Sequence, residues 1–270
     1  MAKVVEVAFR RLGDAVTTAP QDVSDSDAAT FDVLRKMRED ILCCVLKPDQ
    51  KMSFGELRQR YGSSVGTLRE ALSHLVSEGL ARAAVGRGFR VAPISLDDFL
   101  DISEMRVYLE TKTLADAIRN GTDAWEAEIV SSYFLLSKLA RPQPDDTVSM
   151  KQEWAKRHKR YHAALVANCR SPWSLHFRSE LFDQARRYHW LTVIHASPRR
   201  KNEHLGIREA VLARDVELAC SLAEQHIRAT VEQAVSEVPG LVRRSSVHSL
   251  SISKKSSAAK LPHYSRGRGK

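Results

Sequence analysis

Four histidines in the second half of the chain have the spacing of a metal site. His158 and His162 are four residues apart in a stretch with helical periodicity, so both imidazoles project from one face of a helix. His204 and His226 lie on two further predicted helices, on either side of a turn at residues 214–215. In an antiparallel pair, both lie roughly 15–17 Å from that turn and therefore level with each other. Four nitrogen donors at one height suit a divalent ion such as zinc, nickel or copper.

The same spacing has other interpretations. A histidine pair four residues apart is also typical of a helix surface or of hydrogen-bonded core residues, and spacing alone leaves that alternative open. A helical metalloprotease would need a glutamate next to the first histidine as its base, but Lys159, Arg160 and Tyr161 separate the pair here. No serine or cysteine nucleophile has a recognisable setting, so we expect no enzymatic activity.

The elements that must position these histidines are six predicted helices. They cover approximately residues 95–119, 123–139, 150–168, 172–194, 199–213 and 216–238. Ser95, with Asp98 three residues later, is a capping signal for the first helix, and Ser171-Pro172 is a start signal for the fourth. Short loops and the lack of a strand pattern predict an antiparallel six-helix bundle.

A second functional region lies upstream, in residues 30–93. A helix over about 64–78 buries an apolar face and leaves Thr67, Arg69 and His74 pointing outward. Two glycines flank Arg87 and permit a tight hairpin with this arginine at its tip. A basic helix followed by a basic hairpin suits the major groove and the adjacent minor groove of DNA.

Two further helices complete this region. An apolar stripe that includes Phe31 predicts a first helix ending before Lys47-Pro48, and Ser53 can cap a second helix that runs to about Tyr61. Three helices and a two-stranded wing make a winged helix-turn-helix domain. The predicted DNA-contacting residues are Arg58, Ser64, Thr67, Arg69, His74, Arg87 and Gly88. Because one such domain reads only a few base pairs, we expect a homodimer on an inverted-repeat operator.

Residues 47–93 resemble the DNA-binding domain of the GntR family of bacterial transcription regulators. The resemblance rests on Leu-Arg-Glu-Ala-Leu at 68–72, Ser-Glu-Gly-Leu at 77–80 and the wing sequence Gly-Arg-Gly-Phe-Arg-Val-Ala-Pro-Ile at 86–94. Most family members have an arginine after the capping serine, whereas here Ser64 is followed by Val65. The resemblance therefore implies Arg69 as the main base-reading residue.

Residues 95–235 resemble the all-helical FCD effector domain of the FadR subfamily. Tyr161-His162, Glu203-His204 and His226 match its metal-binding pattern, and His158 occupies its aspartate position. The resemblance implies that His162, His204 and His226 bind a divalent ion, for which we expect zinc or nickel. His158 departs from the pattern but is chemically able to ligate.

The resemblance also implies an effector. Leu135-Leu-Ser-Lys-Leu and Leu181-Phe-Asp-Gln-Ala-Arg-Arg-Tyr resemble the carbon-starvation-induced (CsiR-like) branch. This branch implies a repressor of a catabolic operon that responds to a short carboxylic acid such as glutarate. Arg106, at the family's recurrent arginine position, and Arg186 or Arg187 are the predicted effector contacts. The alternatives are a metal sensor, in which the ion is the signal, a histidine–metal enzyme, and an architectural DNA binder.

Length, charge and cysteine content limit the number of domains and the cellular compartment that we expect. The chain of 270 residues has room for two domains and carries a formal charge of +9, most of it in residues 239–270, which contain eight Lys and Arg and no acidic residue. We expect this segment to be a disordered basic tail and residues 1–29 to be a mobile arm. Four cysteines without metal-type pairing fit a reducing cytoplasm. No apolar run reaches the roughly 18 residues that span a bilayer, so we expect a cytoplasmic protein without membrane contact.

Overall fold

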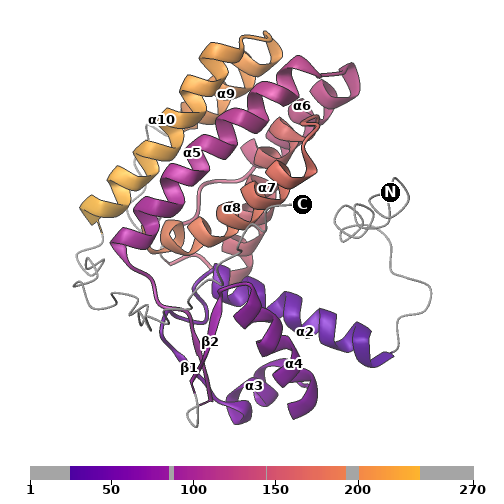
Figure 1. The fold of residues 1–270 in the computed structure, drawn as a ribbon, viewed down its shortest axis with the longest axis vertical. Coiled ribbons are helices and arrows are strands. Elements are labelled where there is room, and N and C mark those ends of the chain that lie inside the picture. The colour runs from indigo at the N-terminus through magenta and orange to yellow at the C-terminus, as the bar shows by residue number, and fades with distance from the viewer. Residues whose placement is uncertain (1–24, 85–87, 144, 193–200, 238–270) are drawn as a thin grey trace, which may run out of the picture.

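The computed structural model describes residues 25–84, 88–143, 145–192 and 201–237 of the chain. Within these residues the chain forms nine helices and three short strands. They make a small domain that contains all three strands and a larger helical domain above it (Figure 1). This architecture confirms the predicted fold class, a winged helix-turn-helix followed by an antiparallel six-helix bundle.

The small domain combines three helices with a three-stranded sheet. Its elements are α2 (Asp25–Leu42), β1 (Lys51–Met52), α3 (Phe54–Tyr61), α4 (Val65–Ser77), β2 (Ala81–Ala84) and β3 (Gly88–Val91). The strands are antiparallel in the order β1-β3-β2, and Phe89 of β3 lies between Met52 and Ala83. The sequence did not predict β1, because two residues are too few to show an alternating pattern.

Capping residues determine where α3 and α4 begin and end. The Ser53 hydroxyl accepts a hydrogen bond from the Glu56 amide, and the Ser64 hydroxyl accepts one from the Thr67 amide, so both serines are N-caps. Gly79 follows α4 with a φ of 70°, a left-handed conformation that glycine adopts without steric cost. These signals set the rotation of α4 and therefore which of its side chains face outward.

Helix α2 differs from its prediction in two respects. It begins at Asp25, inside the segment predicted as a mobile arm, and residues 1–24 lie outside the described residues. Its buried face contains Val33, Met37 and Ile41, whereas Phe31, predicted for this face, is 60% exposed. At about 100° of rotation per residue, Phe31 points roughly away from Val33 two positions later.

The large domain consists of six helices, whose ends agree with the predicted ranges to within a few residues. They are α5 (Leu96–Arg119), α6 (Asp123–Ser137), α7 (Val148–Val166), α8 (Pro172–Thr192), α9 (Lys201–Leu212) and α10 (Val216–Glu237). Helix α5 contacts α7, α8 and α10, so it occupies the centre of the bundle (Figure 1). None of the described helices is long and apolar enough to cross a membrane. The predicted basic tail, from residue 239 onward, lies outside the described residues.

Candidate metal centre and effector cavity

The structure brings the four predicted histidines together in one cluster. His158 and His162 come from α7, His204 from α9 and His226 from α10, and one nitrogen from each lies within 4.8 Å of the others. The Nε2 atoms of His158, His162 and His204 are each 3.1 Å from the other two. Nitrogens bound at right angles to one ion at about 2.1 Å are about 3 Å apart, so this triangle has the dimensions of a ligand set.

A carboxylate orients the fourth histidine. Glu203 Oε2 lies 2.7 Å from His226 Nδ1, and the carboxylate accepts the hydrogen bond from the Nδ1–H tautomer. In this tautomer the Nε2 atom of His226 carries no proton, so its lone pair is available to bind an ion in the cluster. Sequence reasoning used Glu203 only as part of a motif and missed this orienting role, because 23 residues separate it from its partner.

Burial keeps the centre of the cluster uncharged. His162 is 4% exposed, and burial, together with His204, His226, Arg178 and Arg106, lowers its pKa well below the ordinary value. The imidazole is therefore neutral near pH 7, which is the form that binds a metal. The geometry of the donor set and the neutral form of His162 thus fit a divalent ion such as zinc or nickel.

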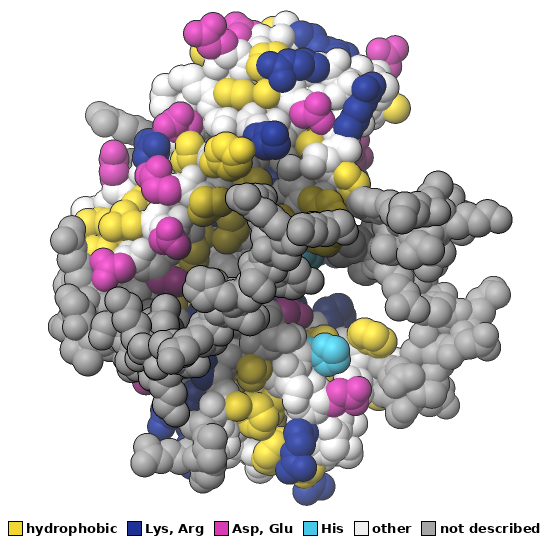
Figure 2. Space-filling model, viewed as in Figure 1, with side chains coloured by type: hydrophobic (Ala, Val, Ile, Leu, Met, Phe, Trp, Pro, Cys, Tyr) yellow, Lys and Arg dark blue, Asp and Glu magenta, His cyan; other side chains and the backbone are white. Residues whose placement is uncertain are grey.

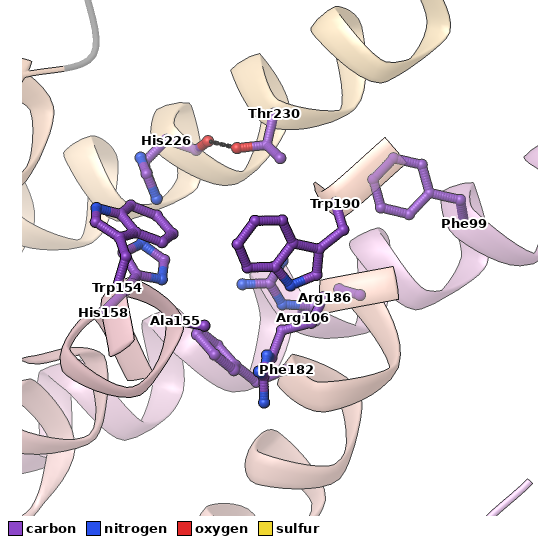
Figure 3. A pocket seen from close by; sticks show the side chains of 11 residues that line it. Phe99, Arg106, Trp154, Ala155, His158, Phe182, Arg186, Trp190, His226 and Thr230 are labelled. Atoms are coloured by element: carbon purple, nitrogen blue, oxygen red, sulfur yellow. Dashed lines mark hydrogen bonds between the residues drawn. The ribbon is translucent and has the colours of Figure 1, made fainter. Parts of the chain in front are cut away.

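A small cavity that is partly open to solvent adjoins the cluster (Figure 3). Its lining includes His158, His226, Arg106 and the aromatic residues Phe99, Trp154, Phe182 and Trp190. The Trp154 indole stacks on the His158 imidazole at 4.5 Å between ring centroids. Sequence reasoning missed both tryptophans, although Trp154 lies four residues before His158 and so on the same helix face.

The predicted effector-contacting arginines have different surroundings. Arg106 lines the cavity with its guanidinium 5.3 Å from the Phe182 ring centre, and its buried Nε has no hydrogen-bond partner among the described residues. Burial lowers the pKa of Arg106 to about 10, although the Glu110 carboxylate opposes this shift. Its guanidinium remains charged at neutral pH, and an anion in the cavity would compensate that charge.

Arg186 also lines the cavity, but its guanidinium already has a carboxylate partner. Arg186 Nη2 donates to Glu39 Oε1 of α2 at 2.5 Å. Arg187 is outside the cavity lining and donates to the carbonyl oxygen of Ala92, between the two domains. The expectation of an Arg187 effector contact is therefore not supported, because consecutive helical residues point about 100° apart.

The predicted DNA-contacting residues lie on the small domain. Arg69 and His74 are exposed on α4, Arg58 is exposed on α3, and the Arg69 guanidinium lies 5.6 Å from the Phe54 ring centre. Ser64 caps α4 and also contacts the Thr67 hydroxyl. Figure 2 shows Lys and Arg side chains at the lower tip of this domain. Gly88 begins β3 with a φ of 80°, and Arg87 lies outside the described residues.

Comparisons with known proteins identify both domains. Residues 30–91 match the bacterial regulatory proteins of the gntR family, and residues 101–229 match the FCD domain. The chain is 37% identical to the uncharacterized HTH-type transcriptional regulator BphR of Paraburkholderia xenovorans (strain LB400), over 82% of this chain and 90% of that protein. The chain belongs to the GntR family. It is also 39% identical to the HTH-type transcriptional repressor GlaR of Escherichia coli (strain K12), over 73% of this chain and 92% of the repressor.

Solved structures of GntR regulators share the fold. A putative transcriptional regulator GntR from Rhodococcus sp. RHA1 superposes with a TM-score of 0.64 at 16% identity, covering 78% of this chain and 99% of that one. Escherichia coli McbR/YncC gives a TM-score of 0.63 at 20% identity, covering 77% and 98%. The chain is therefore a DNA-binding transcriptional regulator with an FCD effector domain, as predicted, and not an enzyme.

Proposed function

We propose that this GntR regulator releases or engages its operator when a small carboxylate binds in the cavity beside a divalent ion. His158, His162, His204 and His226 would hold the ion, with zinc or nickel as the candidates. The supporting observation is Arg106, whose buried Nε has no hydrogen-bond partner among the described residues and which lines the same cavity as two of the histidines. An arginine whose buried Nε lacks an acceptor is suited to a carboxylate.

The charge of the donor set favours the same ligand. Four neutral imidazoles leave the full charge of a divalent ion uncompensated, and such an ion would supply positive charge and an open coordination position for an oxygen ligand. The ion and the Arg106 guanidinium would then place two positive charges beside the cavity, and both would attract an anion. Because the local dielectric is low, these attractions are stronger than at the protein surface.

The aromatic lining narrows the class of acid. Trp154, Phe182 and Trp190 are each less than a tenth exposed and form much of the wall. Arg186, the other cation in the lining, is paired with Glu39. This wall favours a monocarboxylate with a flat apolar body, such as a benzoate-like acid, over the short dicarboxylate glutarate that the family branch implies.

The DNA-bound form would be a homodimer on an inverted repeat, acting as a repressor as the name of GlaR states for that relative. Helix α5 exposes Leu100, Met105 and Tyr108, and Figure 2 shows hydrophobic side chains gathered over α5 and α10. Exposed apolar side chains in a group are typical of an interface between subunits.

The test begins with metal analysis of purified protein, followed by thermal-shift titration with benzoate and with glutarate. A ligand of the native state raises the apparent melting temperature by mass action. Arg106→Met should abolish the shift caused by the acid and retain the metal, whereas Arg119→Met, at the exposed end of the same helix, should change neither. An acid-induced shift that survives Arg106→Met would contradict the proposed contact.

A metal sensor is the second candidate, because the histidine cluster by itself accounts for an ion-dependent switch. Operator binding measured by fluorescence anisotropy separates the two functions. Release of the operator on chelation alone, with no response to any acid, would favour the metal sensor. A response to acid at constant metal content would favour the carboxylate regulator.

A further inference from the structure

We propose that Asp183, a buried carboxylate, couples the effector cavity to the recognition helix α4 through a chain of ion pairs. The inference rests on the proposed function and adds its route of regulation. Asp183 is on α8, its side chain is 3% exposed, and it joins cations from the effector domain and from the DNA-binding domain. A carboxylate in this position responds to a movement of either domain.

The effector side of this connection begins beside a predicted metal ligand. Lys159 follows His158 on α7, and its Nζ donates to both Asp183 oxygens, at 2.9 and 2.7 Å. A rotation or shift of α7 that accompanies binding in the cavity therefore moves Lys159 relative to Asp183. Asp183 is buried and the Lys159 side chain is 35% exposed, so salt screens this pair less than it screens two fully exposed charges.

The DNA side of the connection ends at the C-terminus of the recognition helix. Arg38 of α2 donates from Nη1 to Asp183 at 2.9 Å and from Nε to Glu78 at 2.7 Å. Glu78 is the C-cap residue of α4. Gln184, the residue after Asp183, donates a hydrogen bond from Nε2 to the carbonyl oxygen of Glu78 at 2.8 Å. The end of α4 is therefore held jointly by α2 and α8.

A second contact links the cavity wall to α2 directly. Arg186 lines the cavity, bonds Glu39 of α2 at 2.5 Å and lies 3.6 Å from Asp183. Packing of an acid against this wall is therefore transmitted to α2 through the Arg186–Glu39 pair as well as through Lys159 and Asp183, and the orientation of α4 follows.

A relay of this kind differs from a static contact between domains in one measurable respect. Allosteric coupling changes operator affinity on effector binding, typically by 5- to 150-fold, and a static contact changes it equally with and without effector. The quantity to measure is therefore the ratio of operator dissociation constants with and without acid, in the full-length, metal-loaded protein.

Lys159→Met and Arg38→Met are the test variants, because both side chains are partly exposed and the loss of either leaves Asp183 paired with the other cation. Arg160→Met is the matched control, since Arg160 is the next residue on α7 but pairs with Glu128 of α6. Glutarate and benzoate are the probes, with acid binding followed by calorimetry and operator binding by anisotropy. Melting curves verify that each variant is folded.

We expect wild type and Arg160→Met to show a ratio of at least about 5, and both test variants a ratio near 1 with acid binding retained. An unchanged ratio in Lys159→Met and Arg38→Met would overturn the relay and leave the effector site intact. If neither acid binds wild type, the proposed function fails. The relay is then judged by the change of operator affinity on zinc removal in the same four proteins, and an equal change in all four overturns it.

Discussion

Removal of the metal provides the most direct test of the histidine cluster. Three imidazole Nε2 atoms lie 3.1 Å apart, and burial of His162 disfavours a protonated imidazole at the centre. Without an ion, one Nε2–H can donate to a neighbouring nitrogen, but three mutually adjacent ring nitrogens cannot all be paired in this way. We therefore expect the metal-free protein to be measurably less stable than the loaded protein.

The size of the effect follows from mass action. A ligand of the native state at 100 times its dissociation constant stabilises the fold by about 2.7 kcal/mol. For a domain of 150–250 residues, each kcal/mol shifts the melting temperature by about 2–4 °C. Chelation should therefore lower the apparent melting temperature by about 5–10 °C, and addition of zinc should restore it.

The assay combines elemental analysis with thermal denaturation of the full-length chain. His204→Ala removes a nitrogen of the 3.1 Å triangle and should reduce both the metal content and the response to chelator. His176→Ala is the control, since His176 is half-buried on α8 and outside the cluster. If protein shown to be metal-free melts at the same temperature as zinc-loaded protein, the metal-centre interpretation is refuted.

Four further outcomes are expected. Arg69→Ala should weaken operator binding by about 1–3 kcal/mol in anisotropy titrations, and an unchanged affinity would show that this arginine does not read a base. Gly121→Ala would place a Cβ 2.4 Å from Trp125 Cζ3, so it should destabilise the bundle by about 1–3 kcal/mol in denaturant titrations, and an unaltered midpoint would contradict the packing. His158→Asp should retain the metal but weaken acid binding in calorimetry, because the carboxylate cancels part of the ion's charge; acid binding as tight as in wild type would refute the charge argument. Burial raises the pKa of Asp183, but surrounding cations outweigh this and lower it below the ordinary value. Its stabilisation should therefore be fully present at neutral pH, begin to weaken below about pH 4 and be lost as the pH falls through the lowered pKa, so the difference in melting temperature between wild type and Asp183→Asn should shrink steadily below about pH 4; a difference that stays constant there would contradict this.

The local sequence was sufficient to predict most elements of the fold. Ser53, Ser64 and Ser95 cap the helices that their spacing predicted. The helical ranges of the effector domain followed from periodicity, because apolar side chains recur where a helix faces a core. The prediction that His204 and His226 lie at the same height on their two helices followed from counting residues outward from the turn between them. This counting works because the rise per residue of a helix is constant.

Contacts between elements far apart in the chain could be learned only from the tertiary structure. Arg186 and Arg187 are adjacent and alike in sequence, yet one lines the cavity and bonds α2 while the other bonds the chain after the wing. The partner of Asp183 in the DNA-binding domain, Arg38, is 145 residues away, so no local pattern identifies it. Helix periodicity limits which residues share a face, but the packing of whole helices decides which faces meet, and in this protein that packing joins the cavity to the recognition helix.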